Sequence, residues 1–247
     1  MAKSTKDRDR RAVVEQLRRE QQRKERRRTL VVLAVCVVIA LIIVGAAAVP
    51  LIRSAHESAK PLAELGASRS AAGCQAITTK KANGNQDHKP EGTVINYPEA
   101  PPAFGPHYPT PAPFSRKFYT TADRPKVSYL VHNLEHGYTL LWYDATVAGN
   151  KTQLAAVKAI AGKFAGSSET TRTMKSKFIA APWTSKDGKA FPAGTHVALT
   201  HWSAGKDPSD TSKQKGVWQY CGKPSGAVVT TFMKAYPYSD SPEPQGV

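Results

Sequence analysis

The residues best suited to chemistry lie in one short run, residues 131–137, with the sequence Val-His-Asn-Leu-Glu-His-Gly. His132, Glu135 and His136 fall within five residues of a chain that has 7 histidines. Apolar, β-prone sequence flanks the run within Ser128–Asp144. Imidazole and carboxylate groups bind divalent metals and transfer protons near neutral pH. The spacing predicts a metal-binding or proton-transfer site at the edge of a buried element, without selecting a reaction.

The run also matches the His-x-x-Glu-His pattern of inverted zinc peptidases. On a helix, residues four apart share one face, so His132 and His136 could bind one zinc while Glu135 activates water. Gly137 predicts a break directly after the run, which disfavours the sustained helix that this chemistry needs.

A zinc peptidase would also need a third ligand, usually a downstream glutamate. After His136 the sequence offers only Glu169, in a Ser/Thr-rich segment, and Glu243, near the C-terminus. The flanking segments Lys126–Val131 and Tyr138–Tyr143 are typical of strands. We therefore expect the run to form a turn between two strands.

Two further histidines lie in unusual settings. His88 follows Asp87 in a polar, turn-rich segment, and His107 has Pro106 and Pro109 nearby on either side. Prolines fix the backbone, so the His107 imidazole would be presented with little loss of entropy. Gly105 permits close approach of another segment. The predicted metal ligands are His88, His107, His132, Glu135 and His136.

Two other interpretations stay open. The histidines could instead hold loops in place by hydrogen bonds, with Glu135 paired to Arg116 or Arg124. A hydrolase could use Glu135 with a histidine as an acid/base pair, although a Gly-x-Ser-x-Gly nucleophile motif does not occur. His196 and His201 have opposite parity along a predicted strand, so we expect neither in the cluster.

The ligand types narrow the choice of metal. Imidazole-rich sites suit zinc or copper, and copper(I) is less favoured where thiolate and thioether ligands are missing. Met174 and Met233 are isolated in the sequence. The predicted cofactor is therefore zinc or copper(II), if a metal binds.

The elements that would position these residues indicate an α+β domain. Proline occurs seven times in Pro98–Pro113, which excludes helix and central strand there. The predicted sheet is antiparallel or mixed, with short strands and two helices on it. The other predicted strands are Thr93–Tyr97, Phe178–Pro182 and His196–Trp202, and the predicted helices are Lys151–Ala165 and Ala227–Ala235.

An apolar helix precedes the domain. Leu30–Ile52 has 23 residues without a charge, enough for a helix of roughly 34 Å, which spans a membrane. A cleaved signal peptide is the alternative, because Ala46-Ala47-Ala48 resembles a cleavage site. We predict a basic cytoplasmic helix (1–29), a transmembrane helix (30–52), a stalk (53–73), an exported domain (74–238) and a flexible tail (239–247).

The net charge of +16 does not indicate nucleic acid binding. Met1–Arg28 contains twelve Lys/Arg and five Asp/Glu, and a basic cluster before a span follows the positive-inside rule. We expect the N-terminus in the cytoplasm, near anionic lipid, and the C-terminal domain outside the cytoplasmic membrane. The sequence identifies no protein partner.

Cys74 and Cys221 are the two cysteines outside the apolar segment, which contains Cys36. In an exported domain, pairing of Cys74 with Cys221 is expected. The alternative is two buried thiols.

Three motifs resemble the domain-of-unknown-function family 3105, whose members are mostly actinobacterial. They are Asp87-His88, Pro101–Pro109 (PPAFGPHYP) and Leu130–Tyr143 (LVHNLEHGYTLLWY). The resemblance covers about Gln86–Trp202. It implies a basic N-terminus, one span and an exported domain with a site at the matching residues, and it brings no activity with it.

The sequence departs from the family pattern at two places. Ala103-Phe104 replaces the usual Thr-Ser pair, and Lys89 replaces an apolar residue after His88. A site that used those hydroxyls would be altered here, whereas a site using only the imidazoles and Glu135 would not.

Overall fold

The computed structural model describes residues 2–82, 86–166, 177–205 and 207–246, so that Glu169 and Met174 lie outside the described residues. The chain forms two compact units, Met1–His56 and Glu57–Val247.

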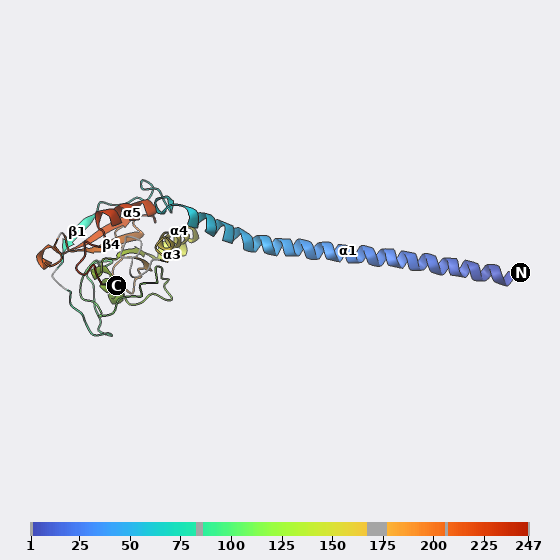
Figure 1. The fold of residues 1–247 in the computed structure, drawn as a ribbon, viewed down its shortest axis with the longest axis horizontal. Helices are drawn as coiled ribbons and strands as arrows, with labels where there is room; N and C mark the ends of the chain where they lie inside the picture. The colour runs from blue at the N-terminus through green and yellow to red at the C-terminus, as the bar shows by residue number, and fades with distance from the viewer. Residues whose placement is uncertain (1, 83–85, 167–176, 206, 247) are drawn as a thin grey trace. The chain divides into compact units, whose positions relative to one another are not determined.

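One long helix, α1 (Ala2–Ala59), makes up the first unit (Figure 1). Its part Val14–Val49 contains an 18-residue window with a mean hydropathy of 3.3, which is long and apolar enough to cross a membrane. Leu41 and Ile42 expose 66% and 64% of their surface, as the side chains of a lipid-facing helix would. The helix is consistent with single-pass anchoring.

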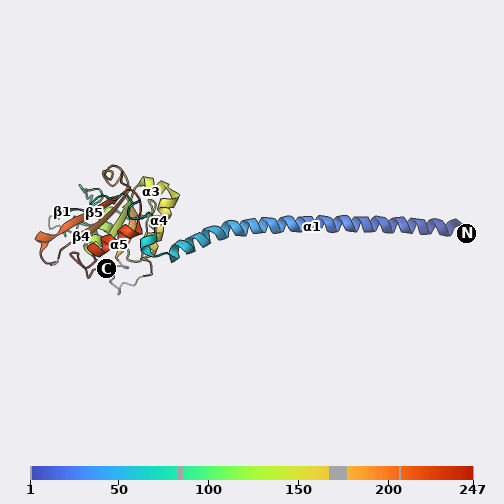
Figure 2. The same ribbon diagram turned by 90° about the horizontal axis from the view of Figure 1, so that it is seen from above.

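A five-stranded open sheet forms the centre of the second unit (Figure 2). Its order is β1-β5-β4-β2-β3. The β2 and β3 strands are parallel, and the other pairs are antiparallel. The predicted α+β fold with a mixed sheet is confirmed. The strands are β1 (Thr78–Lys81), β2 (Thr139–Tyr143), β3 (Phe178–Pro182), β4 (Val197–Ser203) and β5 (Lys215–Cys221).

Four α-helices accompany the sheet in the described part of this unit. They are α2 (Val127–Glu135), α3 (Ala145–Gly149), α4 (Lys151–Gly162) and α5 (Gly226–Ala235), with 3-10 turns at η1 (Leu62–Glu64) and η2 (Thr211–Lys213). The predicted helices near 151–165 and 227–235 are confirmed as α4 and α5.

The strand predicted at Lys126–Val131 is wrong, because the structure has helix α2 there. Val127, Leu130, Val131 and Leu134 are all buried, and their spacing of three and four residues is that of one helix face. The apolar, β-branched composition suggested a strand, but the helical spacing determines the structure.

The central strands are covered on both faces. Leu140 and Trp142 of β2 belong to the core that α2 and the proline-rich segment share. Leu141 and Tyr143 point the other way, into the core built with α4 and α5. Successive residues of β2 therefore pack into apolar cores on opposite faces of the sheet, as expected for a strand buried on both sides.

Several segment predictions differ from the structure. Thr93–Tyr97 is not a strand, and its Val94 is 84% exposed. Strands β1 and β5 were not predicted. Within the segment expected as a stalk, Leu65 and Ala72 are fully buried in the core.

The sulfur atoms of Cys74 and Cys221 lie 2.06 Å apart, at disulfide distance. Cys221 ends β5, and Cys74 makes an antiparallel bridge to it. The pairing expected from the sequence is thus formed, and it closes a loop with a sequence separation of 147.

Candidate functional site

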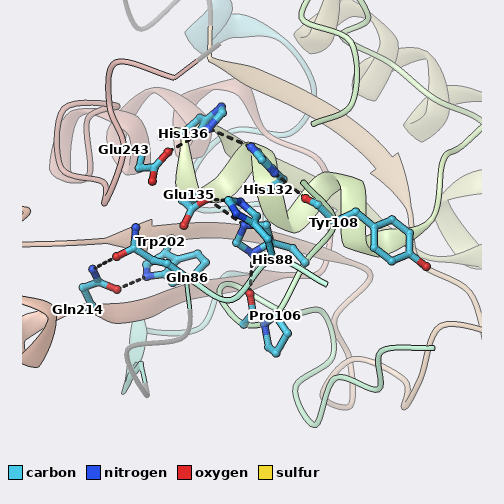
Figure 3. A network of polar contacts seen from close by, with 12 residues as sticks. Gln86, His88, Pro106, Tyr108, His132, Glu135, His136, Trp202, Gln214 and Glu243 are labelled. Atoms are coloured by element: carbon cyan, nitrogen blue, oxygen red, sulfur yellow. Dashed lines mark hydrogen bonds and ion pairs between the residues drawn. The ribbon is translucent and has the colours of Figure 1, made fainter. Parts of the chain in front are cut away.

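Helix α2 carries three of the predicted site residues at its C-terminal end. His132 and His136 lie one turn apart, and their Nε2 atoms are 3.0 Å from each other (Figure 3). Glu135 is fully buried and contacts a different set of residues. The run is therefore the last turn of a helix and not a turn between strands.

Gly137 explains how the helix ends there. Its amide donates to the Leu134 carbonyl and the Tyr138 amide to the Asn133 carbonyl, both at 3.0 Å, which is a Schellman motif. Gly137 has φ +88°, and a Cβ would lie 2.2 Å from the Tyr238 carbonyl oxygen. The glycine that disfavoured a helix in the sequence is thus the residue that caps it.

The proline-rich segment is held against α2 by side-chain hydrogen bonds. Asn133 donates to the Ala112 carbonyl at 3.1 Å and accepts from the Ala112 amide at 2.9 Å. His132 Nδ1 lies 2.6 Å from the Tyr108 carbonyl oxygen. These bonds place His107 beside the last turn of α2.

His88 is positioned by backbone pairing with the same segment. The His107 amide donates to the Asp87 carbonyl at 3.1 Å, and the Lys89 amide donates to the His107 carbonyl at 2.7 Å. Gly105 has φ +132°, and a Cβ added there would lie 3.4 Å from the Tyr97 ring, an ordinary van der Waals distance. The positive φ, and not an unusually close approach, is what favours glycine at this position.

Four ligand groups converge at the centre of this arrangement. His107 Nε2 lies 2.9 Å from Glu135 Oε2, and His88 Nε2 lies 3.6 Å from the same oxygen. The ring centroids of His88, His107 and His132 are 4.8–5.1 Å apart. One ligand atom from each of His88, His107, His132 and Glu135 lies within 4.8 Å of the others.

The hydrogen bonds also determine which nitrogens are available. His107 Nδ1 lies 2.8 Å from the Gly105 carbonyl oxygen, and His132 Nδ1 lies 2.6 Å from that of Tyr108. A carbonyl accepts only, so each Nδ1 carries the proton and donates it. In the neutral rings, each Nε2 therefore keeps a lone pair, as the carbonyl-bound histidines of metal sites do.

The electrostatics of the site favour a neutral His132 and an ionised Glu135. Burial lowers the pKa of His132 to about 4, against the opposing effect of its hydrogen bond to Tyr108. Burial by itself would raise the pKa of Glu135, but the His107 hydrogen bond and charge, with the nearby Gln86 side chain, bring it below its usual value. A lone-pair imidazole beside a carboxylate suits a divalent cation.

His136 belongs to a second, overlapping group. Its Nε2 is 3.5 Å from Glu243 Oε2, and ligand atoms of Glu135, His136 and Glu243 all lie within 4.8 Å of one another. Among the described residues, no group of ligand atoms within 4.8 Å of one another contains His136 together with His88 and His107. The five predicted residues are therefore brought together as two groups that share Glu135.

The residues near the C-terminus hold this second group in place. The Glu243 amide donates to the Glu135 carbonyl at 2.9 Å. The Lys177 ammonium, on a fully buried residue, donates to the carbonyls of His136 and Gly246. Ser241 is also fully buried. The segment expected to be a flexible tail lies along the end of α2.

Glu243 was not predicted as a site residue, although one signal was present. Pro242 and Pro244 flank it, just as prolines flank His107, and such flanking fixes the backbone around a presented side chain. Its position next to His136 depends on the tertiary structure, which no local pattern reveals.

The charged and histidine residues considered as alternatives lie elsewhere. Arg116 pairs with Asp123, and Arg124 pairs with Asp187 at 2.6 Å. His196 Nδ1 bonds Asp144 Oδ2 at 2.8 Å, and His201 Nε2 donates to the Asp240 carbonyl at 2.8 Å. Neither histidine is in the cluster, as expected.

The two departures from the family pattern avoid the cluster. Ala103 and Phe104 are buried in the core, and the Phe104 ring lies 6.1 Å from those of Trp202 and Trp218. Lys89 forms an ion pair with Asp87 at 2.6 Å. The missing hydroxyls therefore belong to a packing position, and the imidazole–glutamate cluster is intact.

Comparison with known proteins places the chain in a family. Residues 88–246 match the family described as protein of unknown function (DUF3105). The match begins at His88 and includes Glu243, so every residue of both groups lies within it. No curated protein and no solved structure matches significantly. Covering more than half of the chain, the match shows that this protein belongs to the DUF3105 family.

Proposed function

We propose that this protein is a membrane-anchored, extracytoplasmic domain that binds a divalent transition metal, zinc or copper(II). The ligands are His88, His107, His132 and Glu135. The observation that carries the proposal is the convergence of these four groups within 4.8 Å, with both buried imidazoles oriented by backbone carbonyls.

The spacing supports a common ion if the more distant ligand atoms move closer together. Ligand atoms of a tetrahedral zinc, at about 2.0–2.1 Å from the metal, lie about 3.4 Å from one another. The His107–Glu135 contact is shorter and the His88–Glu135 contact is slightly longer, at 2.9 Å and 3.6 Å. His88 is the most exposed of the four, with 43% of its side chain accessible, so an ion would arrive from its side.

The protonation of His107 also favours a cation at the site. His107 Nε2 and Glu135 Oε2 approach to 2.9 Å, and a lone pair facing a carboxylate is repulsive unless a proton or a metal lies between them. A divalent ion would replace that proton and attract both the lone pair and the carboxylate. Metal binding is then expected to release a proton.

Two features, the apolar helix and the disulfide, support a location for the C-terminal domain. The basic residues before the apolar part of α1 support a cytoplasmic N-terminus near anionic lipid. The Cys74–Cys221 bond supports an oxidising compartment for the domain. We propose a single-pass protein with its C-terminal domain outside the cytoplasmic membrane.

The second candidate is a non-catalytic envelope domain whose histidines only hold the proline-rich segment on α2. The bonds from His107 and His132 to Gly105 and Tyr108 support it. A zinc peptidase is less well supported even though its motif is helical. Glu135 Oε2 contacts His107 and His88, and among the described residues the downstream Glu243 is grouped with Glu135 and His136 but not with His132.

Metal content tests the proposal. The full chain, purified in detergent and stripped with chelator, is reloaded with Zn²⁺ or Cu²⁺, desalted and measured by mass spectrometry. We expect at least one ion per chain, a higher melting temperature on loading, and loss of both effects in His107→Ala. His196→Ala, which removes a histidine outside the cluster, should retain both.

A folded wild-type chain that retains no ion after repletion contradicts metal binding. If in addition His107→Ala lowers the melting temperature while Zn²⁺ and Cu²⁺ leave that of the wild type unchanged, the envelope-domain alternative is supported.

A further inference from the structure

We infer that the site holds a second divalent cation, bound by Glu135, His136 and Glu243, with the Glu135 carboxylate bridging the two ions. This inference rests on the proposed metal binding by His88, His107 and His132.

The first observation is an unused oxygen of Glu135. Its Oε2 faces His107 and His88, whereas its Oε1 is buried and has no hydrogen-bond partner among the described residues. A buried carboxylate oxygen without a partner is costly. A cation on that side would satisfy it, and a bridging carboxylate uses one oxygen for each ion.

The second observation is that two more ligands lie close to the Glu135 carboxylate. His136 Nε2 and Glu243 Oε2 are 3.5 Å apart, and both offer ligand atoms within 4.8 Å of Glu135. Figure 3 shows Glu243 reaching toward His136 while His132 approaches it from the other side. His132 and His136 Nε2 are 3.0 Å apart, and because His132 Nε2 keeps a lone pair, the proton between them lies on His136 Nε2. In the ion-bound state that proton would move to His136 Nδ1, and each nitrogen could bind one ion of a pair separated by about 3.5–4 Å.

The backbone at this position is fixed before any ion binds. Pro242 and Pro244 flank Glu243, and the Glu243 amide is bound to the Glu135 carbonyl. Gly246 lies so close to the His136 ring that a Cβ would be 2.4 Å from its atoms. Glu243 is thus presented with little entropy cost, as a preorganised ligand requires.

The two positions differ in chemistry. Three imidazoles and one carboxylate form the first, whereas two carboxylates and one imidazole form the second, which is the harder donor set. Glu243 is 48% exposed at its side chain and His136 only 10%, which leaves room for water ligands at the second ion. We expect the second ion to bind more weakly and to exchange faster.

Metal stoichiometry tests this in the full chain in detergent, using Glu243→Gln and the matched control Glu64→Gln, a glutamate exposed at η1. Each protein is dialysed against buffered Zn²⁺ over a range of free concentrations. We expect two Zn²⁺ per wild-type and Glu64→Gln chain, with two affinities, and one tightly held Zn²⁺ in Glu243→Gln.

Glu243→Gln should keep the wild-type melting temperature without metal, since the side chain is half exposed. His136→Gln provides a second variant with the same expected loss of one ion. One Zn²⁺ of equal affinity in wild type and Glu243→Gln overturns the second position but leaves the proposed function standing. A folded wild type that binds none overturns both.

Discussion

At the residue scale, the clearest feature is the orientation of the imidazoles. His107 and His132 each donate from Nδ1 to a carbonyl of the proline-rich segment, and so each turns Nε2 toward Glu135 or His136. Removal of either ring would disturb both the loop and the cluster. Stability and metal affinity must therefore be measured separately for each variant.

The pKa of His132 predicts how the metal-free protein responds to acid. The imidazole pKa is about 4 in the folded chain and about 6.5 when unfolded. Between these values the unfolded chain binds the extra proton, so stability is complete above pH 6.5 and decreases as the pH falls toward 4.

The expected loss is up to about 3 kcal/mol across that window, seen as a falling melting temperature of the chelator-treated full chain. The pKa of Glu135 is also lowered, so the stability that its ionised carboxylate contributes is likewise lost as the pH falls. In His132→Gln the melting temperature should depend less on pH over this window. A melting temperature that rises from pH 6.5 to 4.5 would contradict the neutral, buried state of His132.

At the scale of elements, the C-terminus of α2 is the critical junction. Its last turn presents His132, Glu135 and His136, and Gly137 reverses the chain into β2. The proline-rich segment and the C-terminal residues meet the helix at this same end. The site therefore depends on one helix cap.

Gly137→Ala should destabilise the protein by roughly 2–4 kcal/mol, because alanine at φ +88° is strained and its Cβ meets the Tyr238 carbonyl. Thermal unfolding of the full chain measures this. Gly149→Ala is the control, since its Cβ has nothing within 4 Å and lies in helix α3, where alanine is preferred. Equal melting temperatures for the two variants would be inconsistent with the Schellman cap.

The sequence predicted some elements and missed others for identifiable reasons. Helices α4 and α5 follow from apolar spacing. The composition of α2 favours a strand although its apolar spacing is helical, and Gly137 caps the helix where the sequence predicts a break. The residues of the first group can all be predicted, since their motifs are local. Glu243 could not be placed, because its contact with His136 spans more than one hundred residues.

At the scale of the whole molecule, the chain combines an apolar helix suited to a membrane with a domain closed by one disulfide. The bond links the segment before β1 to the end of β5, and η1 also contacts α5. The start and end of the domain are therefore joined both covalently and by packing.

Loss of the Cys74–Cys221 bond should lower stability by up to about 5 kcal/mol, since closing a loop of this length removes much of the entropy of the unfolded chain. The melting temperature of the Cys74→Ser/Cys221→Ser chain should match that of the reduced wild type. Added reductant should not affect the variant. An oxidised wild type no more stable than the variant would contradict a structural role for the bond.

X-ray absorption at the zinc edge tests whether the imidazoles and Glu135 share an ion. The full chain in detergent is loaded with one equivalent of Zn²⁺, beside His132→Ala. We predict a four-coordinate nitrogen/oxygen shell at about 2.0–2.1 Å, with imidazole scattering that diminishes in His132→Ala. A shell of oxygen alone, identical in both proteins, would contradict zinc binding by the imidazoles.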